Sequence, residues 1–239
     1  NQRSFVMAAC AMAVTAGAWA RQSNEIPAPR QTAQVVLRHV DVRPCTPGAK
    51  PITDGWVVFE GGKVTALGTE PMAPSAAKPD AYFIDAPGHV LTPGLWASAT
   101  TLGLIETAQV EATDDTTEFG EFHAEIRAAT ATNPDSDLPP VARNAGILMA
   151  HVFPQGGVVG GHASAMRLDG WTVMDRTANA DAGVIVHWPM MEPVQTRWQQ
   201  KTADEQRKDR DKAVAAIDRF FDSAEAYLRA RTADPSLNK

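Results

Sequence analysis

Two histidines near predicted strand ends are the residues of this chain whose side chains could take part in the widest range of reactions. His151 lies in an apolar run, residues 148–153, and His162 directly follows a glycine-rich stretch, residues 156–161. An imidazole can accept a proton near neutral pH or bind a metal ion. We therefore take His151 and His162 as candidate substrate-binding residues. The alternative for each is a structural role, in which the ring is hydrogen-bonded in the core or to loop backbone.

Acidic residues gather in a threonine-rich stretch, residues 105–120, which we expect to form a long loop. Asp114 and Asp115 could contact a substrate or a hard cation through their carboxylate oxygens. The stretch lacks the spacing, the glycine and the final glutamate of an EF-hand, so a solvated acidic loop is the alternative. His187 ends another apolar stretch, residues 183–186, and either faces a binding site or packs structurally.

Other catalytic patterns are missing from the sequence. The glycine-rich stretch 156–161 has neither the Lys-Ser/Thr pair of a P-loop nor a G-x-G-x-x-G fingerprint, so we interpret it as a flexible turn rather than a phosphate cradle. No G-x-S-x-G motif is present, and Cys45 has no evident partner that would activate it. We expect Cys45 to be inert, and the catalytic residues stay unidentified.

Five stretches, in order along residues 35–175, resemble the imidazolonepropionase-like branch of the amidohydrolase superfamily. They are VVLRHVDV from Val35, DGWVVFEGGKVTALG from Asp54, IDAPGHVLTPG from Ile84, ARNAGI from Ala142 and GGVVGGHA from Gly156. Each stretch is short, but their order is specific. The resemblance implies a small β-sandwich followed by a (β/α) TIM-type barrel.

The same resemblance implies hydrolysis of carbon–nitrogen bonds other than peptide bonds, in cyclic or linear amides, by a water that a divalent metal, usually zinc, activates. The family's first barrel strand carries Pro-Gly-x-x-Asp-x-His-x-His, which places two imidazoles on one strand face. This chain has Ala97 at the aspartate position, and Ala99-Thr100-Thr101 replaces His-x-His. No residue is therefore assigned to a metal, and metal content and mechanism stay open.

Two alternatives to an active hydrolase remain. One is a non-catalytic envelope binding protein derived from an amidohydrolase, which keeps the barrel mouth as a ligand site. The other is one half of a split or truncated enzyme, because residues 95–239 are fewer than the roughly 250 that a complete barrel needs. Histidines at later strand ends and a final aspartate, in sequence downstream, would favour a rebuilt metal site.

Composition and the N-terminal stretch set the broad class. The 239-residue chain has 44% hydrophobic residues and a net charge of −6, which fits a globular protein and argues against a nucleic-acid partner. An uncharged apolar run closes with an Ala-Trp-Ala pattern at Ala20, which predicts a signal peptide over residues 1–20 and a periplasmic or secreted protein. Residues 21–34 are expected to form a linker. After cleavage we expect no membrane span, a small-molecule substrate or ligand, and either an oligomer or a missing C-terminal half.

The sequence pattern divides the remainder into two parts. β-Branched residues and a Gly-Gly turn over residues 35–92 predict a small composite β-sandwich, and residues 93–239 predict the first part of the barrel. Strands are expected at residues 35–42, 56–60, 63–68, 82–85, 94–101, 147–153, 163–168 and 183–186. Helices are expected at residues 121–130, 137–144 and 202–231. The fold class is therefore α/β with a β-sandwich and an incomplete (β/α) TIM-type barrel.

The last helix is the most clearly patterned element. Thr202 and Glu205 form a capping box, and Val214, Ile217 and Phe221 begin one apolar face. Burying each large side chain contributes roughly 1.5–3 kcal/mol, so this face needs a partner. We expect the isolated chain to oligomerise or aggregate through that face and through open sheet edges.

Overall fold

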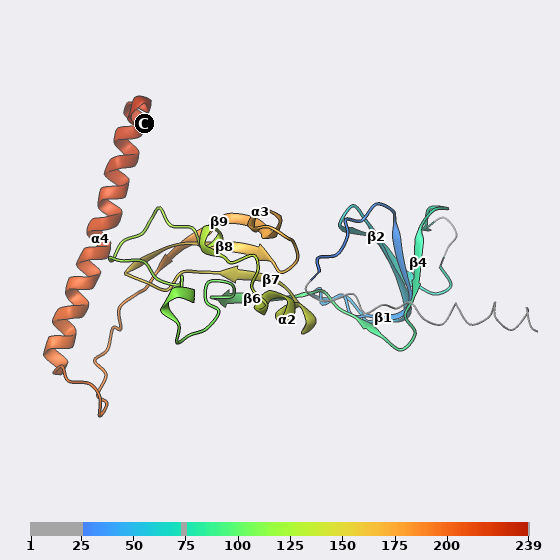
Figure 1. Ribbon diagram of the computed structural model, residues 1–239, viewed down its shortest axis with the longest axis horizontal. Coiled ribbons are helices and arrows are strands. Elements are labelled where there is room, and N and C mark those ends of the chain that lie inside the picture. The colour runs from blue at the N-terminus through green and yellow to red at the C-terminus, as the bar shows by residue number, and fades with distance from the viewer. Residues whose placement is uncertain (1–25, 73–75, 239) are drawn as a thin grey trace, which may run out of the picture. The chain divides into compact units, whose positions relative to one another are not determined.

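The computed structural model describes residues 26–72 and 76–238 (Figure 1). The chain divides into two compact units. The first comprises residues 1–96, 137–149 and 168–171, and the second comprises residues 97–136, 150–167 and 172–239. The predicted signal peptide lies outside the described residues. Among the residues that are described, no helix is long and apolar enough to cross a membrane.

The first unit is built on one five-stranded sheet. Its strands are β1 (Val35–Val42), β2 (Ile52–Glu60), β3 (Lys63–Thr69), β4 (Tyr82–Asp85) and β5 (Val90–Leu91). The order is β3-β2-β1-β4, and β5 also pairs with β1. β1 runs antiparallel to β2 and parallel to β4 and β5. The strands of the predicted sandwich are thus joined in a single sheet.

A bend in β1 explains how one strand serves three partners. The β1–β2 register shifts between Leu37 and Val40, and His39 between them has a φ of 54°. A positive φ at a non-glycine residue interrupts the extended backbone locally. Before the bend β1 pairs with β4, and after it β1 pairs with β5.

Both faces of this sheet carry buried apolar clusters. One cluster is Val36, Trp56 and Val58, and the other is Val40, Val42 and Val57. Successive residues of a strand point to opposite faces, so Val57 and Val58 serve different clusters. A strand that is covered on both faces has consecutive apolar residues in its sequence, which explains the apolar run within β2.

Two glutamines from the predicted linker are hydrogen-bonded within the first unit, Gln31 to the β2–β3 hairpin and Gln34 to Lys78. Gln31 donates from Nε2 to Phe59 O (2.8 Å) and accepts at Oε1 from Gly62 N (3.1 Å). Gln34 is buried, and its Oε1 accepts from Lys78 N at 2.7 Å. These contacts tie a segment without regular secondary structure to the first unit.

A second sheet has four strands in the order β6-β7-β8-β9 (Figure 1). They are β6 (Leu95–Thr100), β7 (Ile147–Val152), β8 (Val159–Arg167) and β9 (Thr177–Val186). All four predicted strands are confirmed, but β8 and β9 begin earlier than expected, and Gly160 and Gly161 belong to β8 rather than to a loop. The two sheets and the helices confirm the α/β class. A closed TIM-type barrel is not shown in the described part of the chain.

The described helices are α1 (Ala128–Ala131), α2 (Leu138–Asn144), α3 (Val173–Arg176) and α4 (Ala203–Ala233), with 3-10 turns η2 (Glu111–Thr113) and η3 (Pro235–Asn238). The helices predicted at residues 137–144 and 202–231 are confirmed. The helix predicted at residues 121–130 is wrong for most of its length, because helix begins only at Ala128, with the short α1.

Residues 121–127 lie along β8 instead of forming a helix. Phe122 forms a bridge with Val159, and Arg127 forms one with His162. Backbone groups that pair with a strand are not free for the i→i−4 bonds of a helix. A tertiary contact thus overrides the local preference of this segment.

The start of α4 follows the predicted capping box. Glu205 N donates to Thr202 Oγ1 (3.3 Å), and Thr202 N donates to Glu205 Oε2 (2.8 Å). Ile217 is buried, and the Phe220 ring stacks on Phe122 with centroids 5.1 Å apart. The large apolar side chains further along α4 are exposed: Phe221, Tyr227 and Leu228.

Candidate functional site

β6 and the residue after it carry the positions of the aspartate and of the two metal-binding histidines in the resembled motif. Ala97 and Ala99 lie on the same face of β6, because they are two residues apart, and Thr101 directly follows the strand. An alanine methyl group has no lone pair, and a neutral threonine hydroxyl is a poor substitute for an imidazole. Among the described residues, no group of three or more His, Cys, Asp or Glu side chains could hold a metal ion. The residues present therefore do not fit the divalent metal that the resemblance implies.

His151 lies beside this substituted position. Backbone hydrogen bonds of 2.9 and 3.0 Å join the starts and the ends of β6 and β7, which makes the two strands parallel. The bond at the end, from Phe153 N to Thr100 O, sets a register in which Ala99 is the neighbour of His151. Neighbouring residues in a parallel pair point to the same face of the sheet. His151 therefore occupies the strand face on which the motif places its ligands.

The imidazole of His151 has an unsatisfied nitrogen. Its Nε2 is buried and has no hydrogen-bond partner. Leaving a buried polar atom unpaired costs about 1–3 kcal/mol. The alternative of a fully satisfied core histidine therefore does not hold for this atom. One imidazole is not a metal site, but it is a hydrogen-bonding group that a small ligand could satisfy.

His162 lies in β8 and is paired with a carboxylate of β9. Its Nδ1 is hydrogen-bonded to Oδ1 of Asp181. The side chain of His162 is 16% exposed, and that of Asp181 is 52% exposed. Sequence reasoning selected His162 but missed Asp181, because no local pattern connects the two positions. Only the antiparallel pairing of β8 with β9 brings them together.

The two acidic candidates do not form a cation site with a third carboxylate in the described structure. Asp114 Oδ1 accepts from Thr116 Oγ1 (2.5 Å) and Thr116 N (2.9 Å). These bonds, the hydroxyl first, hold the pKa of Asp114 below its usual value. Asp115 is exposed, and its backbone N donates to Leu104 O at 2.8 Å. Oδ1 of Asp114 therefore stabilises a local turn.

The glycine-rich stretch 156–161 is packed against a neighbouring segment. Val158 N donates to Glu121 O, and His162 N donates to Ile126 O, both at 2.7 Å. A phosphate cradle needs backbone N–H groups that point at the anion. Within the stretch, the N–H groups of Val158 and Val159 are already bonded to Glu121 O, so these two are not free to bind a phosphate.

Two further histidines lie close to β8. His123 is only 6% exposed, its backbone N donates to Val159 O at 2.8 Å, and its Nε2 is buried without a partner. Sequence reasoning missed it because residues 121–127 were predicted to be helical. His187 directly follows β9 and donates from its backbone N to Val158 O at 2.8 Å, which supports the packing alternative for this residue.

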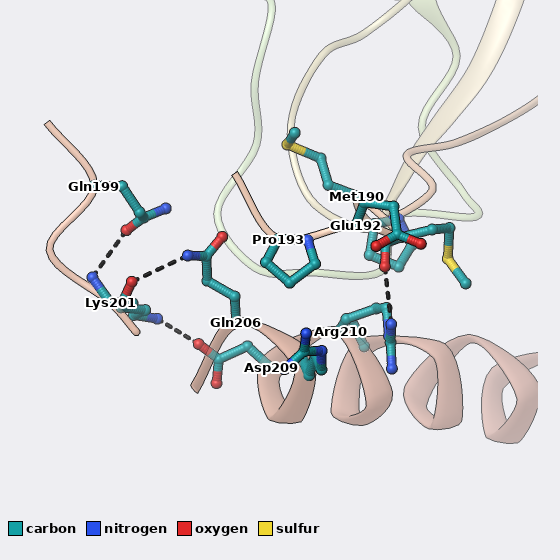
Figure 2. Close-up of a pocket in the computed structure, with 12 residues that line it drawn as sticks. Met190, Glu192, Pro193, Gln199, Lys201, Gln206, Asp209 and Arg210 are labelled. Atoms are coloured by element: carbon teal, nitrogen blue, oxygen red, sulfur yellow. Dashed lines mark hydrogen bonds and ion pairs between the residues drawn. The ribbon is translucent and has the colours of Figure 1, made fainter. Parts of the chain in front are cut away.

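A cavity of about 330 Å³ lies in the second unit between residues 189–201 and α4 (Figure 2). Its polar walls bond to one another: Arg210 Nη1 donates to Met191 O (2.8 Å), and Lys201 Nζ donates to Asp209 Oδ2 (2.5 Å). The bond from Lys201 holds the pKa of Asp209 below its usual value. Because these groups satisfy one another, the cavity is a contact between a segment and a helix rather than a prepared ligand site.

The fold has a counterpart among solved structures. The crystal structure of an amidohydrolase from Thermotoga maritima MSB8 matches with a TM-score of 0.65 and 19% sequence identity, covering 86% of this chain and 51% of that chain. This chain therefore spans about half the length of the protein that it matches. No family model and no curated protein matches the sequence. The described part of the chain thus has an α/β fold similar to that of an amidohydrolase.

Proposed function

We propose that this chain is part of an amidohydrolase-like hydrolase that acts on carbon–nitrogen bonds other than peptide bonds, in a cyclic or linear amide. The observation that carries the proposal is the structural similarity to an amidohydrolase over 86% of the chain. The ordered motifs along residues 35–175 favour the imidazolonepropionase-like branch. In this proposal β6 to β9 belong to the first part of a (β/α) TIM-type barrel.

The proposed reaction is attack of water on an amide carbonyl, followed by loss of the amine. In the resembled family a divalent metal activates that water. Ala99 and Thr101 do not supply its first two ligands, so we propose a site that diverges from the family's metal centre. His151 and His162 are the described residues proposed to contact the substrate.

An activity screen of the protein in its longest encoded form tests this proposal. Hydantoin and dihydrouracil are suitable cyclic amides, and N-acetyl amino acids are suitable linear ones, each with added zinc or with a chelator. We expect hydrolysis of at least one substrate. Cys45→Ser is the matched control, because Cys45 is exposed and lies in the first unit. A folded protein that hydrolyses no amide under any metal condition would contradict the proposal.

Metal analysis tests the divergent site separately. We expect a purified chain of residues 21–239 to hold no stoichiometric zinc, because alanine and threonine stand where imidazoles are needed. One tightly held zinc per chain would show that ligands outside the expected positions assemble a site.

A non-catalytic envelope binding protein is the second candidate function. The observation that favours it is that Ala99 and Thr101 stand at the two ligand positions of the motif, while β6 keeps its place in the sheet. Titration calorimetry with the same amides would discriminate between the two. Binding without turnover supports the binding protein, and turnover supports the hydrolase.

We also propose that the protein is exported and cleaved after Ala20. The Ala-Trp-Ala pattern that ends the apolar run supports this proposal. N-terminal sequencing of the protein from a periplasmic or secreted fraction is the test. An uncleaved protein in the cytoplasm would contradict it.

A further inference from the structure

The pairing of β8 with β9 contains a wide irregularity. Two pairs flank it, Ala163 with Gly183 and Ala165 with Asn179. A single residue of β8, Ser164, therefore lies opposite three residues of β9. Bulges of this kind bend a strand and redirect its side chains, and they are frequent next to functional sites.

The side chain of Ser164 stabilises this irregularity by hydrogen bonds in the interior of the second unit. The residue is fully buried, and its Oγ donates to Ala180 O (2.8 Å) and accepts from Ala129 N (2.9 Å). Both bonds of the hydroxyl are thus made to backbone groups, which fixes the chain next to Asp181. The bulge is therefore an ordered part of the second unit that specific hydrogen bonds stabilise.

Asp181 is the middle residue of the three, and it bonds to Nδ1 of His162. A carboxylate only accepts hydrogen bonds, so Nδ1 carries the proton and the lone pair of the neutral ring lies on Nε2. The buried, unpaired ring nitrogens of the described chain belong to His123 and His151, and Nε2 of His162 is not among them. The ring of His162 bonds to the described residues through Nδ1, and Nε2 has no partner among them, so its absence from the buried set means that it is accessible.

We infer that His162 and Asp181 form a proton-accepting pair that serves the proposed hydrolase, on which this inference rests. As the water oxygen bonds to the amide carbonyl carbon, Nε2 of His162 takes a proton from the water. When the carbon–nitrogen bond breaks, this proton goes to the leaving nitrogen, and the products are a carboxylic acid and an amine. Asp181 is the positioning residue, because it fixes the tautomer and stabilises the protonated ring.

Ring-nitrogen NMR of protein labelled with ¹⁵N-histidine tests the pair without any turnover. We expect His162 to carry its proton on Nδ1 in the wild type and to lose this preference in Asp181→Asn. His162→Gln assigns the resonance, and Cys45→Ser is the control. A wild-type His162 ring that carries its proton on Nε2 would overturn the inference.

Titration with hydantoin and the activity screen test the role of the accessible nitrogen. We expect hydantoin to move the Nε2 resonance, His162→Gln to lower kcat by about 100-fold or more, and Asp181→Asn to lower kcat by about 10-fold with KM almost unchanged. A moved resonance without hydrolysis supports the pair as a binding site and contradicts the hydrolase. An unmoved resonance, or an unchanged kcat in His162→Gln, overturns the pair. If His162→Gln does not fold, Asp181→Asn and the titration decide.

Discussion

Two glycines of this chain, Gly62 in the β2–β3 hairpin turn and Gly161 in strand β8, are needed for different physical reasons. At Gly62 in the first unit, φ is 73° and an added Cβ would meet nothing within 4 Å. At Gly161 in the second unit, φ is 115° and an added Cβ would lie 3.0 Å from Ile126 O. Gly62 is needed only because the local backbone has a positive φ. Gly161 also lets a segment distant in sequence approach closely.

This difference explains why the sequence predicts the hairpin turn at Gly61-Gly62 correctly but does not predict that Gly160 and Gly161 belong to a strand. The Gly-Gly pair between β2 and β3 is a local signature of a hairpin, and its positive φ values follow from the turn itself. The stretch 156–161 was predicted to be a flexible turn. Part of it belongs to β8 and is hydrogen-bonded to residues 121–127, whose position no pattern within the stretch indicates.

The largest expected effect is that of adding one methyl group at Gly62 or at Gly161. Gly161→Ala should lower the free energy of unfolding by about 2–4 kcal/mol, because backbone strain and overpacking add. Gly62→Ala should cost only about 1 kcal/mol, because the strain acts alone there. Urea unfolding of both variants measures the difference. Equal losses of unfolding free energy in the two variants would contradict the difference proposed between Gly62 and Gly161.

Removing the hydroxyl that holds the bulge should have the next largest effect. Ser164→Ala leaves the backbone groups of Ala129 and Ala180 without this partner, which should cost about 1–3 kcal/mol. Ser223→Ala is the control, because this exposed helix serine should change stability by less than about 0.5 kcal/mol. A wild-type-like unfolding midpoint for Ser164→Ala would show that the bulge does not depend on this residue.

Acid should weaken a contact of the first unit that is not local. Arg38 Nε bonds to Glu70 Oε1 at 2.7 Å, which holds the pKa of Glu70 below its usual value, with help from Met72 N. A carboxyl group whose pKa is lower in the folded than in the unfolded state stabilises the fold at pH values above its unfolded-state pKa. This stability is lost as the pH falls through the folded-state pKa. We expect the unfolding midpoint to fall more steeply with pH below the usual glutamate pKa in the wild type than in Glu70→Gln. Parallel pH profiles would contradict this role.

The smallest expected effect on stability concerns the exposed end of α4. Leu228 is 60% exposed, so Leu228→Glu should change the free energy of unfolding by less than about 0.5 kcal/mol. The same change should reduce self-association of the isolated chain, because it places a charge in an exposed apolar face. Light scattering measures this. A wild-type chain that is a compact monomer with one sharp, reversible transition would contradict the expected association.

The candidate site could be predicted only in part. His151 and His162 were selected because histidines near strand ends can do chemistry, and the structure places both in strands of the second sheet. Asp114 was selected for its charge, but its oxygen is bonded within a turn. Asp181 and Ser164 carry no signal in the sequence, since their roles arise from pairing across two strands.

The sequence by itself determined the elements that depend on near neighbours along the chain. The hairpin at Gly61-Gly62 and the capping box of Thr202 follow from turn and helix-end chemistry within a few residues. Only the tertiary structure decided that residues 121–127 lie along β8, that β1 bends to serve three strands, and that His162 meets Asp181. These features depend on the register between segments far apart in the chain, and register is set by packing rather than by local preference.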